Sequence, residues 1–96
     1  MTLEVLMSVI KPNIFYVIKR FPGRERAIQG LFKTSGSFRT LCEDYQQCDQ
    51  ALERWNATDT EVSQTRVAEY SALMEELEAE IIETLDRYRE TQLSNI

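Results

Sequence analysis

The sequence predicts an all-α protein, in which a long antiparallel helical hairpin carries short N-terminal helices packed on it. Two segments, residues 38–55 and 67–88, have apolar residues at steps of three and four, the spacing of one helix face. Only about three to five residues separate the two predicted helices, and so short a connection joins antiparallel helices. A chain of 96 residues with 43% hydrophobic and 28% charged side chains is typical of one folded domain.

We divide this single domain, residues 1–96, into short N-terminal helices over 1–34, the hairpin over 35–91 and a tail over 92–96. The N-terminal part holds two apolar patterns that suit short helices. Pro12 stops the first, whereas Pro22 and Gly23 open the second, which closes near Gly36. Their apolar residues are Leu3, Leu6, Met7 and Ile10, and then Ala27, Ile28, Leu31 and Phe32.

The segment NIFYVIKRF, residues 13–21, leaves helix and extended structure both open. Its β-branched and aromatic residues favour a strand, but no second strand is predicted nearby for it to pair with. We therefore interpret the segment as a short helix. Its buried residues would be Ile14, Val17, Ile18 and Phe21.

The first long helix begins with a cap from Ser35 or Ser37 and ends at Asn56. Its apolar residues cover an arc of about 100° on a helical wheel, which is the width of one packed face. This predicted seam consists of Phe38, Leu41, Tyr45, Cys48, Leu52 and Trp55.

The second long helix is predicted over residues 60–91, with Thr58 and Glu61 as a capping box. Its apolar residues are Val67, Tyr70, Met74, Leu77, Ile81, Leu85 and Tyr88, with Leu73 and Ile82 on the flanks. Folding the hairpin about Thr58 sets Phe38 near Glu78. The second helix then extends past the first, and its last apolar residues need a further cover. These residues are Ile82, Leu85 and Tyr88.

Two covers for this overhang stay open. The N-terminal helices could close it within one chain, or a second chain could cover it in a homodimer. Leu52 and Leu77 are expected to be core residues, each costing about 2 to 5 kcal/mol on truncation to alanine.

The net charge of −5 is unevenly distributed, with +4 on residues 1–36 and −7 on residues 59–96. The basic residues include Lys19, Arg20 and Arg24, which lie near the aromatic residues of the same segment. Two interpretations stay open, namely a contact with an anionic membrane surface and packing against the acidic C-terminal helix. Because the whole chain is acidic, we expect no nucleic-acid partner.

Cys42 and Cys48 are six residues apart, about 9 Å along a helix and 120° around it, so they cannot form a disulfide with each other. Cys48 lies on the predicted seam and Cys42 on its flank. We expect both to pack as small apolar residues, and a partly exposed Cys42 is the candidate redox thiol. Glu43 and Asp44 would raise the pKa of that thiol and lower its reactivity.

The acidic run of residues 75–90 is interpreted as a solvated helix face, with Glu83 and Arg87 as an i,i+4 ion pair. The chain has no histidine and no glycine-rich phosphate loop, and it carries neither a zinc pattern nor a nucleophile motif. We therefore expect no catalytic, metal-binding or cofactor-binding residue and no enzymatic activity. The sequence shows neither a secretory signal nor a membrane-spanning run, which favours a cytoplasmic location.

The pattern Ser35-Gly36-Ser37-Phe38 followed by Leu41, Tyr45, Asp49, Leu52 and Glu53, and then Leu73, Glu76, Glu80, Ile81 and Leu85, resembles the YdcH-like family over residues 27–90. The resemblance implies a small bacterial helical hairpin of unknown function. This chain has Ser37 where that family commonly places histidine, and its N-terminal segment lies outside the resemblance.

The predicted function is a small protein–protein interaction or assembly module, a homodimer or a module for a protein partner that the sequence does not identify. The alternative is a peripheral membrane or lipid-responsive regulator that uses residues 12–26. The two differ in whether binding to anionic vesicles depends on Lys19, Arg20 and Arg24.

Overall fold

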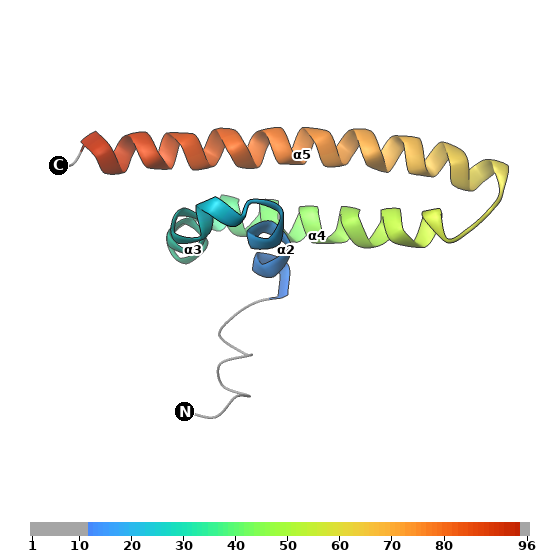
Figure 1. Cartoon of the computed structure of the whole chain (residues 1–96), viewed down its shortest axis with the longest axis horizontal. Helices are drawn as coiled ribbons and strands as arrows, with labels where there is room; N and C mark the ends of the chain where they lie inside the picture. Colours follow the sequence, from blue (N-terminus) through green and yellow to red (C-terminus); the bar gives the residue numbers. More distant parts are fainter. Residues whose placement is uncertain (1–11, 95–96) are drawn as a thin grey trace, which may run out of the picture.

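The computed structural model describes residues 12–94, which are helical apart from short connections. Helix α2 (Pro12–Arg20) leads through a 3₁₀ turn, η1 (Pro22–Arg24), into α3 (Glu25–Thr34). Then α4 (Gly36–Asn56) and α5 (Glu61–Ser94) run side by side in opposite directions, with α2 and α3 against one end of the pair (Figure 1). The predicted all-α class and the antiparallel hairpin are confirmed.

The ambiguous segment is a helix, as predicted. Helix α2 buries Ile14 and Val17 and half-buries Ile18, and Phe21, which directly follows the helix, is half-buried as well. Helix α3 buries Ile28 and Leu31, and it half-buries Ala27 and Phe32. The other expected N-terminal helix, residues 3–10, lies outside the described residues.

Ser35 caps α4 as predicted, because its side-chain oxygen accepts a hydrogen bond from the Phe38 amide at 3.1 Å. The predicted box of Thr58 and Glu61 at the start of α5 is wrong. Thr60 and Ser63 exchange these bonds instead, Thr60 N donating to Ser63 Oγ at 2.9 Å and Ser63 N donating to Thr60 Oγ1 at 3.1 Å. Ser63 is buried and can hold the start of the helix in place, whereas the side chain of Glu61 lies in solvent.

The core lies where α2 and α3 cover the hairpin. Helix α4 packs against α5 on one side and against α2 on the next, so its buried face is rotated from the predicted seam. Leu41, Leu52 and Trp55 are only half-buried, whereas Cys42 and Ala51 are buried. The buried residues of this core are Ile14, Val17, Ile28, Leu31, Phe38, Cys42, Tyr45, Cys48, Leu77, Ile81 and Leu85.

The predicted pairing of Phe38 with Glu78 is also wrong. Tyr45, not Phe38, lies opposite Glu78, with 3.0 Å between the phenol oxygen and Oε1. Phe38 is two turns away along α4 and lines a groove with Glu80 and Thr84. The hydrogen bond between Tyr45 and Glu78 centres the pairing of the two helices near residue 61 rather than at Thr58, so α5 is shifted along α4.

The overhang of α5 is therefore shorter than predicted, and α3 covers part of it. Leu85 is fully buried, and the Tyr88 hydroxyl reaches Gly30 of α3. Helix α5 also continues to Ser94, through residues that we predicted as the tail.

Candidate functional site

The basic residues of α2 and η1 face the acidic helix α5. Arg20 binds Glu78 through two hydrogen bonds of 3.0 Å, and Nη2 of Arg24 lies 2.9 Å from Oδ1 of Asp86. The hydrogen bonds that Arg20 donates to Glu78 raise the pKa of its guanidinium, which is charged in any case. Of the three predicted lipid-binding cations, only Lys19 forms no ion pair among residues 12–94.

Tyr45 completes a small network with these two side chains, because its hydroxyl donates to the Glu78 oxygen that also accepts from Nε of Arg20. Burial, followed by this hydrogen bond, raises the pKa of Tyr45 strongly. The phenol therefore stays protonated and acts as a donor. The network fixes α2 across the hairpin.

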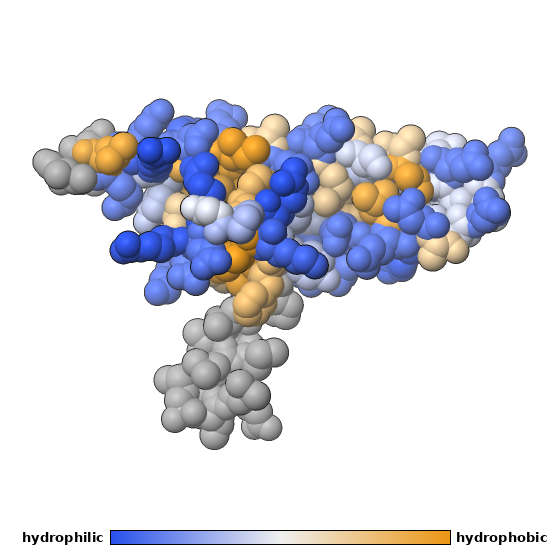
Figure 2. Space-filling view, viewed as in Figure 1, coloured by the Kyte–Doolittle hydropathy of each residue, from blue (hydrophilic) through white to orange (hydrophobic). Residues whose placement is uncertain are grey.

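The three overhang residues have different environments. Leu85 lies in the core and Tyr88 is half-buried beneath α3, so α3 of the same chain already covers these two. Ile82 is 41% exposed, between the ion pairs made by Glu78 and Asp86. Figure 2 shows apolar side chains gathered over α2 and the adjoining part of α5, with polar side chains on both sides.

The expectation that Cys42 is partly exposed, and so a candidate redox thiol, is wrong. Its side chain has no exposed surface, because α2 covers the flank that the hairpin alone would leave open. Burial, with a smaller effect from Glu43, raises the pKa of the thiol to about 12. Cys48 is buried as well and lies 3.4 Å from the Tyr70 carbonyl oxygen, as predicted for a packed thiol. Both thiols are protonated and shielded at neutral pH.

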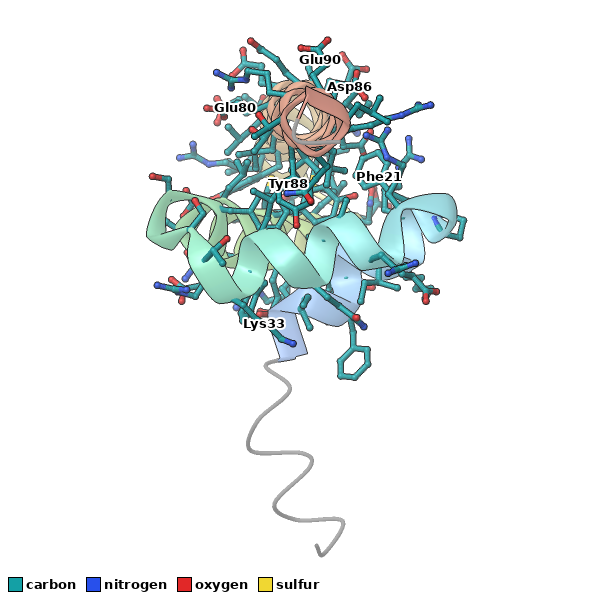
Figure 3. All side chains as sticks on the ribbon, turned by 90° about the vertical axis from the view of Figure 1, so that its left-hand side faces the viewer. Phe21, Lys33, Glu80, Asp86, Tyr88 and Glu90 are labelled. Carbon is teal, nitrogen blue, oxygen red and sulfur yellow. The ribbon has the colours of Figure 1, made fainter. Side chains whose placement is uncertain are left out.

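The candidate site that remains is the side of the hairpin away from α2. In Figure 3, Glu80 lies on one side of α5, whereas Asp86 and Phe21 lie on the other. Two grooves that share Asp44 run along the Glu80 side between α4 and α5. We define the open face as the lining of the first groove with Glu80 of the second and the neighbouring Arg66. It consists of Asp44, Gln47, Cys48, Ala51, Arg54, Arg66, Tyr70, Leu73, Leu77 and Glu80.

The open face combines apolar side chains with charges of both signs. Leu73 is 41% exposed at its centre and Tyr70 is half-buried beside it, whereas Leu77 and Ala51 form the floor of the groove. No segment of residues 12–34 lines this groove. Two packed helices bury one stripe each, so the part of the hairpin beyond α2 exposes apolar surface that a further helix could cover.

Sequence reasoning placed Leu73 on the flank of the stripe but missed the open face as a unit. The periodicity of α5 was visible, but which flank α2 would cover was not. Among residues 12–94, no cluster of acidic or cysteine side chains is arranged to hold a metal ion.

No helix among the described residues has the length and hydrophobicity to cross a membrane. The chain matches no family model, no curated protein and no solved structure. The resemblance to the YdcH-like family therefore stays a prediction.

Proposed function

We propose that this protein is a small interaction or assembly module that binds another polypeptide through the open face. One observation carries the proposal: Leu73 is 41% exposed over an apolar groove that no residue of α2 or α3 lines. Leaving a leucine of this size half in water forgoes about 1 kcal/mol of hydrophobic stabilisation, which a bound helix would recover.

The composition of the groove supports a helical partner. Ala51 keeps the groove shallow on the α4 side, while Tyr70 and Leu77 form its apolar wall on the α5 side. Asp44 and Arg54, at its two ends, would orient a partner that has opposite charges at matching positions.

A membrane-binding role is the less favoured candidate. Arg20 and Arg24, two of its three cations, form ion pairs with Glu78 and Asp86 in the same chain. A lipid headgroup would have to displace those carboxylates. Anionic vesicles should therefore retain little of the protein, and changing Lys19, Arg20 and Arg24 together to alanine should not alter that fraction.

The test is site-specific photo-crosslinking in the native cells. A photoreactive amino acid at Leu73 should produce an adduct with a second polypeptide, identified by mass spectrometry, whereas the exposed Ala79 on another side of α5 is the matched control. The identified polypeptide, once purified, should bind the wild type and lose at least about tenfold in affinity for Leu73→Glu. Equal adduct yields at Leu73 and Ala79, or equal binding to Leu73→Glu, would contradict the proposal.

A further inference from the structure

We infer that the polypeptide that covers the open face is a second copy of this chain, packed so that each α4 lies antiparallel to the other. This inference rests on the proposed function and adds the identity of the partner. It is argued from the positions of four charged residues and two apolar ones, and it uses a different surface from the overhang at Ile82, Leu85 and Tyr88.

Helix α4 carries a stripe of residues with an acid at one end and an arginine at the other. Asp44, Gln47, Ala51 and Arg54 fall within an arc of about 80° on a helical wheel, so they form one stripe along the helix. In an antiparallel pair centred at residue 49, Asp44 of each copy faces Arg54 of the other, and Gln47 faces Ala51. Since a two-fold axis makes every contact twice, two ion pairs form at the ends of the stripe. The small side chain of Ala51 leaves room for the longer Gln47.

Helix α5 carries a second stripe of this kind, with an arginine at one end and an acid at the other. Arg66, Leu73 and Glu80 are seven residues apart and fall within an arc of about 40°. In an antiparallel pair centred at Leu73, the two Leu73 side chains face each other and Arg66 of each copy faces Glu80 of the other. The exposed leucine is then buried at the middle of the interface, where apolar contacts contribute most to binding.

One two-fold axis serves both helices. The Tyr45–Glu78 hydrogen bond fixes the relative height of α4 and α5. Residue 49 is four positions from Tyr45, and Leu73 is five positions from Glu78, in the matching direction along the antiparallel pair. By this contact the two centres lie within about 1.5 Å of the same height, and the contact of Cys48 Sγ with the Tyr70 carbonyl oxygen places them about 6 Å apart. The two charge patterns thus agree on a single two-fold axis to within about one helical turn.

The alternative two-fold arrangement is disfavoured by charge. If the axis ran parallel to the helices, α4 would lie over α5 of the second copy, and Asp44 would meet Glu80 at the same height. These two acids already line one groove within the monomer. Within residues 12–94, Asp44, Arg54 and Glu80 form no ion pair, so all three are available to the partner. Arg66 lies 2.9 Å from Glu69 of the same chain, and in the dimer it exchanges this exposed carboxylate for Glu80 of the other copy. Only the antiparallel arrangement gives both acids a basic neighbour.

Charge reversal tests this arrangement, because a two-fold pair can be restored by exchanging its charges. Sedimentation equilibrium of the whole chain should show a dimer. Asp44→Arg and Arg54→Asp should each raise its dissociation constant about tenfold or more, and the double variant D44R/R54D should return it to within about threefold of the wild type. Leu73→Glu should abolish the dimer. Glu53→Arg, an exposed charge reversal on the α2 side of α4, is the matched control and should leave the dimer unchanged.

Circular dichroism of every variant distinguishes loss of the dimer from unfolding. All substituted residues are on the surface or the rim of the groove, so their exchange should leave the fold intact. A monomeric wild type up to about 1 mM overturns the inference. A dimer that Ile82→Glu dissociates but Leu73→Glu does not also overturns it, as does a double variant no better than its single parents. If the chain is monomeric while Leu73 still crosslinks a different protein that binds it specifically, the inference fails and the proposed function stands.

Discussion

The phenol of Tyr45 donates a hydrogen bond of 3.0 Å to Oε1 of Glu78, and this contact ties the middle of α4 to the middle of α5. The same carboxylate accepts two hydrogen bonds from Arg20 of α2. One acid thus holds three helices together. Glu78 is only partly exposed, whereas the Arg20 side chain is about half in water, so the Tyr45 bond is the better shielded of the contacts.

Tyr45→Phe should remove this bond without changing the packing of the ring. We expect the free energy of unfolding to fall by about 1 kcal/mol, the usual net effect of one hydrogen bond. Urea unfolding followed by circular dichroism measures it. Tyr70→Phe is the matched control, because the Tyr70 hydroxyl makes no hydrogen bond within residues 12–94, and it should cost less than half as much. In a double-mutant cycle with Glu78→Gln, additive effects would contradict a direct interaction.

Gly30→Ala should destabilise the protein although alanine favours helices by about 1 kcal/mol over glycine. A methyl group at Gly30 would overlap the Tyr88 hydroxyl and lie 3.1 Å from Cζ of the ring, so Tyr88 would have to move out of its place beneath α3. Tyr88→Phe removes the overlapping oxygen. The double variant G30A/Y88F should therefore be more stable than Tyr88→Phe alone in thermal unfolding. A Gly30→Ala variant more stable than the wild type would mean that α3 does not press on Tyr88.

Ser63→Ala should cost about 1 to 2 kcal/mol, because it removes the buried hydroxyl that accepts from the Thr60 amide and donates towards the Thr58 carbonyl. Glu61→Ala changes the exposed residue that the sequence pattern assigned to the cap, and it should cost under about 0.5 kcal/mol. Chemical denaturation of both variants gives the comparison. An equal loss of unfolding free energy in the two variants would mean that Glu61 contributes to the cap as the sequence pattern predicted.

Leu77→Ala should cost about 2 to 5 kcal/mol, because the side chain is 7% exposed and its removal leaves a cavity. Leu52→Ala, which we expected to be equally severe, should cost roughly half as much, since Leu52 is only half-buried in the part of the hairpin beyond α2. Equilibrium unfolding at a protein concentration low enough to keep the chain monomeric separates these effects from any association. A larger loss for Leu52 than for Leu77 would contradict the observed rotation of α4.

The buried thiol of Cys42 should make stability fall at alkaline pH. Its pKa is about 12 in the folded chain and 9.0 in a model thiol. Below about pH 9 both states keep the proton, so this group adds no pH dependence. Between about pH 9 and pH 12 the unfolded chain releases a proton that the folded chain retains. The free energy of unfolding then falls by up to about 1.4 kcal/mol per pH unit from this group. The raised pKa values of Tyr45 and Cys48 act in the same direction.

Urea unfolding at about pH 8 and about pH 10.5 measures this loss. Alkylation gives an independent readout. At about pH 8, iodoacetamide should modify Cys42 and Cys48 far more slowly in the native protein than in urea, because both side chains are buried. Rapid alkylation of Cys42 in the folded protein would show that the thiol is accessible and would support its role as a redox thiol.

The sequence alone determined the helices of this protein and the direction of its hairpin. Periods of three and four residues, a serine before α4 and a short connection after Asn56 are local signals, and local signals suffice to place helices and to reverse the chain. For the basic N-terminal part they left two interpretations open, and the ion pairs of Arg20 with Glu78 and of Arg24 with Asp86 show that it packs against the acidic C-terminal helix.

The tertiary structure decided which flank of each helix is covered. Cys42 is buried and Leu52 half-exposed because α2 crosses one side of α4, and no periodicity within α4 contains the position of α2. Likewise, the packing of α5 against α4 set a register in which Tyr45 rather than Phe38 faces Glu78. A helix pattern gives the width of an apolar stripe, but the neighbours that bury it come from distant parts of the chain. The open face around Leu73 became visible only once those neighbours were in place.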